Sequence, residues 1–119
     1  MNVEQFRDYC LSKHFVTEDL PFNKTTLVFK VLGKMFALTG LDADDFRINL
    51  KCDPERAVIL REEHPSIMPG YHMNKQHWNT VIVDGSFSQK LLLELIDHSY
   101  ELVLKSLPKS VRKELAKQQ

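Results

Sequence analysis

An alternating apolar stretch, followed at once by a glycine and a second apolar stretch, restricts the fold of this chain most strongly. Residues 26–32 (TLVFKVL) are rich in β-branched and aromatic residues, and Leu27, Phe29 and Val31 share one side of an extended chain. Gly33 and Lys34 come next, before the apolar run 35–38. Glycine in the first central position suits a type II′ turn. We therefore predict a β-hairpin closed by Gly33 and Lys34, with a positive φ at Gly33.

Further strands are predicted after the hairpin. In residues 46–52 the apolar positions Phe46, Ile48, Leu50 and Cys52 alternate with polar ones, which indicates a strand with one buried and one polar face. A second strand is expected over residues 78–84 (WNTVIVD), and a short one near Tyr71.

Four helices are predicted around these strands. A short amphipathic helix follows Asn2, and a second one begins at Asp53-Pro54 and runs to about Glu63. Ser86, with Gln89 three residues later, forms a capping-box pattern before the longest helix, which ends near residue 107. A final short helix covers residues 108–117.

The segment between the first helix and the hairpin lacks periodicity. Residues 13–25 contain Pro21 and Asn23, so we predict a loop. Its apolar residues Phe15, Leu20 and Phe22 are expected to pack that loop against the core. The element order then indicates a two-layer α+β domain with a mostly antiparallel sheet and helices on one face.

Composition limits the broad class of the protein. The 119 residues suit one domain, residues 1–119. The formal net charge is +0, so no overall basic field draws the chain to nucleic acid or anionic lipid. With only Cys10 and Cys52, no CxxC pair and no apolar run of membrane length, we expect a cytoplasmic protein without a membrane span.

The segment 51–78 holds the polar and aromatic residues of the kinds that form sites. Tyr and Trp can stack on bases, Lys75 and His77 can meet phosphates, and prolines bracket the loop that carries them. We predict a ligand- or partner-binding cleft there, formed by Lys51, Arg61, Tyr71, His72, His77 and Trp78. The alternative is that Trp78 is a core or rim anchor, and both interpretations stay open.

Basic residues form a second candidate site. Residues 105–119 carry five basic residues against Glu114, a formal +4, and several of them share one helical face. The positions that could meet nucleic-acid phosphates are Lys34, Lys75, Lys109, Arg112 and Lys113. A solvated terminal helix and a lysine at an ordinary hairpin tip are the alternative interpretations.

Catalytic and metal-binding patterns are not found in the sequence. His64, His72, His77 and His98 form neither an HxxxH helix motif nor a Cys/His cluster. No serine has a GxSxG setting, no glycine-rich phosphate loop occurs, and Cys52 has the buried parity of its strand. We expect a binding module without a cofactor or metal, rather than an enzyme.

Three stretches, taken together, resemble the MmcQ/YjbR family. They are TEDLPFNKTTLVFKVLGKMFAL (17–38), LKCDPERAVILREEHPSIMPGYHMNKQHW (50–78) and LLLELIDHSYELVLKSLPKSVRKEL (91–115). The resemblance implies an α-β(3)-α-β(2)-α arrangement with a curved antiparallel sheet. It also implies DNA binding of a "double-wing" type, in which the wings are loops beside the sheet. A protein- or small-ligand-binding adaptor is the alternative function.

Overall fold

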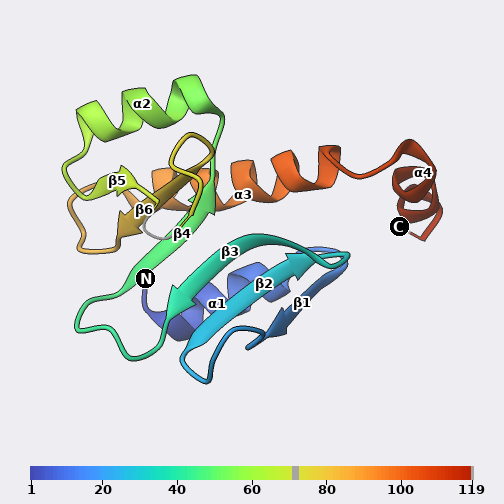
Figure 1. Cartoon of the computed structure of the whole chain (residues 1–119), viewed down its shortest axis with the longest axis horizontal. Coiled ribbons are helices and arrows are strands. Elements are labelled where there is room, and N and C mark those ends of the chain that lie inside the picture. Colours follow the sequence, from blue (N-terminus) through green and yellow to red (C-terminus); the bar gives the residue numbers. More distant parts are fainter. Residues whose placement is uncertain (71–72, 119) are drawn as a thin grey trace.

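An open sheet of antiparallel strands is the centre of the molecule in the computed structural model, which describes residues 1–70 and 73–118. Within these residues six strands pair in the order β1-β2-β3-β4-β6-β5 (Figure 1). Their bounds are β1 Val16–Asp19, β2 Thr26–Val31, β3 Lys34–Gly40, β4 Arg47–Lys51, β5 Ile67–Pro69 and β6 Trp78–Ile82. The helices are α1 Val3–Leu11, α2 Pro54–Glu63, α3 Gln89–Lys105 and α4 Lys109–Gln118. The predicted α+β class is confirmed.

Three helices supply side chains to one core on one face of the sheet. Figure 1 shows α1 and α3 behind the sheet, while α4 stands apart beyond the end of α3. Phe6 of α1 meets Phe29 of β2 edge to face, with ring centroids 5.4 Å apart. The same core takes in Ala57 and Leu60 of α2 and Leu95 and Ile96 of α3. The opposite face of the sheet has none of these helices on it.

The segment predicted as a loop contains a strand that the prediction missed. Residues Val16–Asp19 pair antiparallel with β2, opposite Val28 to Val31, and form an edge of the sheet. This strand has four residues, and three of them are polar (VTED), so it carries little of the alternation that reveals longer strands. Four strands therefore precede α2, instead of the three expected.

The apolar residues of this segment were expected to pack against the core, and only one of the three does so. Phe15 does pack against the core. Leu20 and Phe22, however, remain 43% and 63% exposed, so they do not fix the loop to the core. Both residues follow the edge strand, on the way to β2, where no helix covers them.

The hairpin forms as predicted, but its turn lies one residue earlier. Val31 pairs with Lys34, so the two central residues are Leu32 and Gly33. Both have positive φ, 49° and 83°, which is the pattern of a type I′ turn rather than type II′. The positive φ predicted for Gly33 is confirmed, while Lys34 belongs to β3.

The N-cap predicted for α2 is confirmed, whereas the N-cap predicted for α3 is wrong. Asp53 caps α2 as predicted, because its carboxylate accepts from the Arg56 amide at 3.1 Å. The capping box assigned to Ser86 is wrong: Ser88 caps α3 and accepts from the Leu91 amide at 3.1 Å. The Ser86 hydroxyl instead pairs with that of Ser66 at 2.8 Å.

Ser99 connects the longest helix to the middle of the sheet. Its hydroxyl, which is fully buried, donates to the Phe36 carbonyl at 2.5 Å and accepts from the Lys51 amide at 2.9 Å. These backbone groups lie at the end of the β3–β4 ladder, beyond the pair Ala37–Leu50. The hydroxyl thus satisfies a donor and an acceptor that the ladder leaves unpaired.

Candidate functional site

The helix-free face of the sheet carries the most developed candidate site. Its apolar centre consists of Val28, Leu38 and Trp78, with Met35 and Met73 packed against them. Cross-strand pairing places Val28 beside Leu38, Leu38 beside Asn49, and Asn49 beside Thr80. Directly paired residues share a face, so one row crosses the sheet from apolar to polar side chains.

A hollow of about 440 Å³ lies over this row, and we call it the open-face hollow. Its walls come from the loops before β2 and between β3 and β4, from strands β2, β3, β4 and β6, and from Met73. The residues that line it are Phe22, Asn23, Thr26, Leu38, Thr39, Gly40, Ala43, Arg47, Asn49, Met73 and Thr80. A volume of this order holds a small organic ligand.

Local hydrogen bonds hold the polar side chains of the hollow. The Thr80 hydroxyl donates to Asn49 Oδ1 at 2.6 Å. Arg47 donates from Nε and Nη2 to the two oxygens of Asp45, both at 2.7 Å. This charge-assisted pair lowers the pKa of the Asp45 carboxyl below its ordinary value, so both groups stay charged near neutral pH.

Arg61 holds the loop that supplies Met73. Its Nε donates to Asn79 Oδ1 at 2.7 Å, and its Nη2 donates to the carbonyls of Lys75 and Trp78. At the other end of the loop, the Gly70 amide donates to the Trp78 carbonyl at 2.8 Å. A Cβ on Gly70 would lie 2.8 Å from the Trp78 Cβ, so only glycine fits this close approach.

A family model named YjbR matches residues 11–102 of the chain. The chain belongs to the YjbR family. It is 39% identical to the uncharacterized protein YbdF of Escherichia coli O157:H7, over 92% of this chain and 90% of that protein. It is 31% identical to the uncharacterized protein YjbR of Escherichia coli K12, over 95% and 96% of the two chains.

Solved structures share the fold of this YjbR chain. A crystal structure of a Deinococcus radiodurans protein, described as a DUF419 domain, superposes with a TM-score of 0.91 at 48% identity. That match covers 97% of this chain and 88% of the other. A Pseudomonas syringae protein superposes with a TM-score of 0.74 at 36% identity, covering 87% and 99% of the two chains.

The cleft predicted for this YjbR chain is divided between the two faces of the sheet. Lys51 and Trp78 pair directly, so both lie on the helix-free face, where Trp78 packs into the apolar centre and is 8% exposed. Arg61 instead reaches the buried Asn79, whose partner Leu50 belongs to the helix-covered core. The His77 carbonyl accepts from the Cys52 amide at 2.8 Å. Tyr71 and His72 lie outside the described residues.

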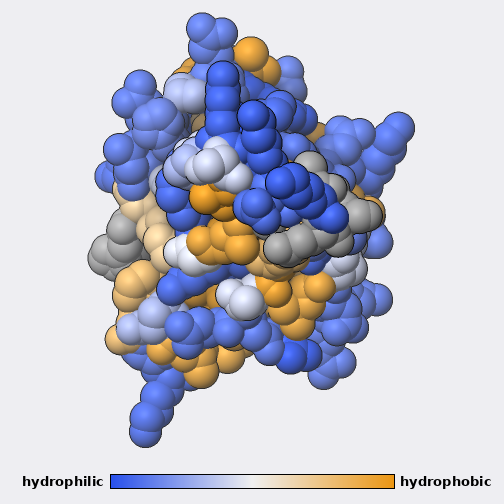
Figure 2. Space-filling view, turned by 90° about the vertical axis from the view of Figure 1, so that its right-hand side faces the viewer, coloured by the Kyte–Doolittle hydropathy of each residue, from blue (hydrophilic) through white to orange (hydrophobic). Residues whose placement is uncertain are grey.

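The predicted basic residues of the YjbR chain are only partly brought together. The β2–β3 turn, which Lys34 follows, and α4, which carries Lys109, Arg112 and Lys113, point toward the same end of the molecule (Figure 1). Lys75 lies away from them, in the loop that Arg61 holds. Arg112 Nε is buried and has no hydrogen-bond partner among the described residues, whereas Lys109, Lys113 and Lys117 of α4 are exposed. Figure 2 shows this end of the molecule as hydrophilic, with hydrophobic patches near its middle.

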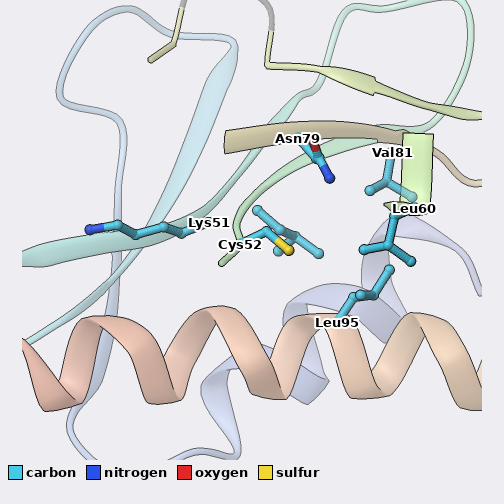
Figure 3. A pocket seen from close by; sticks show the side chains of 7 residues that line it. Lys51, Cys52, Leu60, Asn79, Val81 and Leu95 are labelled. Atoms are coloured by element: carbon cyan, nitrogen blue, oxygen red, sulfur yellow. The ribbon is translucent and has the colours of Figure 1, made fainter. Parts of the chain in front are cut away.

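A second, much smaller cavity lies inside the core. Its volume is about 10 Å³, and Cys52, Leu60, Val81 and Leu95 form part of its lining (Figure 3). The Lys51 side chain points away from it. That space suits one water molecule and no larger ligand. Burial raises the pKa of the Cys52 thiol, so it stays protonated and weakly nucleophilic near neutral pH.

Other reactive side chains are also held in structural roles. Cys10 is buried and unpaired, and burial raises its pKa to about 12. Tyr9 donates to Asp97 at 2.6 Å, and Lys13 pairs with the same carboxylate at 2.5 Å, which connects α1 to α3. Among the described residues no group of three or more potential ligands could hold a metal ion. In the same residues, no helix combines the length and apolarity that crossing a membrane requires.

Sequence reasoning assigned none of the residues that line the hollow to a site. A signal for two of them was present, because Arg47 and Asn49 occupy the polar positions of a strongly alternating strand. The predicted two-layer arrangement left one face of the sheet without helices, but it did not indicate which residues would surround a hollow there. Phe22 and Met73 come from loops, whose positions depend on hydrogen bonds to distant residues.

Proposed function

We propose that this YjbR-family domain is a cytoplasmic binding module without catalysis of its own, and that it holds a small, largely apolar ligand in the open-face hollow. The observation that carries the proposal is the hollow itself, about 440 Å³ on the face that no helix covers. Ligand sites are typically concave, mostly apolar and furnished with a few polar groups, and this one follows that description. Two free, buried cysteines are consistent with a reducing compartment.

Exposed apolar side chains at the hollow supply a driving force for binding. Phe22, which lines it, is 63% exposed, and the neighbouring loop carries Leu41 at 50%. The Leu41 amide donates to the Thr25 carbonyl at 2.6 Å, which joins the two loops. Covering such surface gains roughly 25 cal/mol per Å² of apolar area, so a ligand that shields Phe22 is favoured.

Blocking the hollow tests this function. Ala43 is exposed and lines the hollow, so Ala43→Trp fills it without disturbing the core. We expect neutral aromatic probe compounds to shift the Met73 methyl and Asn49 side-chain signals in NMR spectra of the wild-type protein, and not of Ala43→Trp. Lys90→Trp, which introduces the same side chain at an exposed position of α3, should leave the shifts intact. Absence of any such shift in the folded wild-type protein contradicts the proposal.

DNA binding is the second candidate, and the shared end of the β2–β3 hairpin and α4 favours it. Lys109 and Lys113 are exposed and one helical turn apart, and Lys34 opens β3 at the same end. Contacts from such residues go to phosphates and carry no base specificity. The family resemblance points to the same partner.

A salt titration separates this candidate from the first. If duplex DNA binds, Lys109→Gln with Lys113→Gln should weaken binding to all sequences alike and reduce the salt slope by about two. Lys24→Gln with Lys90→Gln removes the same charge from other exposed positions and serves as the control. Lack of binding by the wild-type protein at low salt would rule out this candidate.

A further inference from the structure

We infer that the ligand of the open-face hollow is a neutral carbonyl compound with an apolar body, which accepts hydrogen bonds from Asn49 and Arg47. This inference rests on the proposed ligand-binding function and specifies its ligand class. It follows from the balance of donors and acceptors in the hollow, from the charges beside it, and from its apolar wall.

Unused hydrogen-bond donors line the hollow on its polar side. Asn49 Oδ1 is occupied by the Thr80 hydroxyl at 2.6 Å, whereas the amide NH₂ of Asn49 has no partner among the described residues. Arg47 uses Nε and Nη2 for Asp45, which leaves Nη1 without a partner within the same part of the chain. Nitrogens of both kinds only donate, so a ligand must bring acceptors to them.

The two side-chain amide oxygens that line the hollow, those of Asn23 and Asn49, already accept hydrogen bonds. Asn23 Oδ1 accepts from the amides of Thr25 at 2.8 Å and Thr26 at 2.7 Å, which shapes the turn before β2. The Arg47 carbonyl accepts from the Thr39 hydroxyl at 2.9 Å. A ligand rich in donors would therefore find few partners here, and its desolvated donors would weaken binding.

Charge beside the hollow disfavours an anion. Among the described residues of the lining, Arg47 is the only one with a charged side chain, and Asp45 neutralises it in a bidentate pair. Two more carboxylates, those of Asp42 and Asp44, lie in the loop between β3 and β4. Asp42 Oδ1 lies close to Gly40, which lines the hollow: it is 3.9 Å from the position that a Cβ on this glycine would occupy. The loop thus has excess negative charge next to the lining, so a neutral acceptor is favoured over a carboxylate.

The remaining wall selects an apolar body. Phe22, Leu38, Ala43 and Met73 face the hollow, and methionine and an exposed phenylalanine side chain can adapt to a flat ring. A body of one ring with a short chain would span from these residues to the Asn49 amide, as the pairing of Leu38 with Asn49 places them side by side.

Three probes with one phenyl-alkyl body test the ligand class. Benzylacetone carries a neutral carbonyl, hydrocinnamate a carboxylate and phenylpropylamine an ammonium group. We expect benzylacetone to bind several-fold more tightly than hydrocinnamate, with shifts at the Asn49 side-chain NH₂ and the Met73 methyl in NMR titrations. Asn49→Asp keeps an acceptor for the Thr80 hydroxyl but removes both donors, so it should weaken benzylacetone by about three- to tenfold.

The controls separate the failure of this inference from that of the proposed function. Gln89→Glu adds the same charge at an exposed position of α3 and should leave all three affinities unchanged. Equal binding of the probes at Met73, tighter binding of hydrocinnamate or of phenylpropylamine, or an unaltered affinity in Asn49→Asp overturns the ligand class while the ligand-binding function stands. If no probe binds, or if a concentration-dependent dimer shifts the same signals, the hollow is not a ligand site. Both the proposed ligand-binding function and the inferred ligand class are then wrong.

Discussion

At the scale of single residues, the turn between β2 and β3 contains the clearest conflict between sequence and conformation. Leu32 has a φ of 49°, a region that L residues with larger side chains rarely adopt, and its side chain is 40% exposed. Type I′ turns favour asparagine before glycine. Leucine at this position therefore carries strain without the compensation of full burial.

Replacing Leu32 by asparagine should stabilise the protein. We expect Leu32→Asn to raise the free energy of unfolding by about 1 kcal/mol, since asparagine tolerates the left-handed region. Gly33→Val should lower it by about 1–3 kcal/mol from conformational strain alone, because nothing lies within 4 Å of the added Cβ. Chemical denaturation measures both changes, and equal stability of the three proteins would contradict the turn assignment.

The N-cap of α2 permits a second prediction at this scale. Asp53→Ala removes the carboxylate that accepts from the Arg56 amide, and should cost about 1 kcal/mol. Asp53→Asn retains a capping oxygen and should lose less. The cap assignment fails if the alanine and asparagine variants melt together with the wild-type protein.

At the scale of elements, α3 and the start of α2 meet through a histidine. His98 Nε2 accepts from the Asp53 amide at 3.1 Å, so the bond requires the neutral ring. Burial, assisted by Arg56, lowers the pKa of His98 below its ordinary value of 6.5. The unfolded chain therefore binds this proton more readily than the folded one, and protonation favours unfolding.

Stability should fall as the pH decreases through the ordinary histidine range. His98 contributes fully to the free energy of unfolding above about pH 6.5, the ordinary pKa of histidine in the unfolded chain. This contribution is lost as the pH falls from there through the lower pKa that His98 has in the folded protein. We expect His98→Gln to reduce the pH dependence of the free energy of unfolding between roughly pH 5 and 7. An identical pH profile in His98→Gln would contradict this role.

The contact between α2 and the loop before β6 depends on Arg61. Arg61→Met leaves Asn79, which is 3% exposed, without its donor, and should cost about 2 kcal/mol. It should also shift the NMR signals of Met73 and weaken probe binding in the open-face hollow. Arg56→Met, on the same helix and without a side-chain hydrogen bond among the described residues, is the control. Intact Met73 signals in Arg61→Met would show that the loop holds its position by other contacts.

At the scale of the whole molecule, α4 is separable from the sheet and its three covering helices. The family model ends at residue 102, and α4 stands beyond the end of α3 (Figure 1). Removing residues 109–119 should change the free energy of unfolding by no more than about 1 kcal/mol, because Leu107, which is buried, is retained. Ligand binding in the hollow should persist, while any DNA binding should decline. Unfolding of the truncated chain would show that α4 belongs to the core.

The sequence by itself determined the element order wherever the local pattern was strong. Alternation over residues 26–52 and the Asp53-Pro54 start of α2 are local signals, and both agree with the structure. The short polar strand β1, the exact turn residues and the Ser88 cap depend on competing local choices that tertiary pairing resolves. The element order also predicted helices on one face of the sheet, but only the tertiary structure decided that Phe22, Asn49 and Met73 meet on the other face. Burial on one side of a sheet is a property of the assembled layers, so no single segment encodes which face remains open.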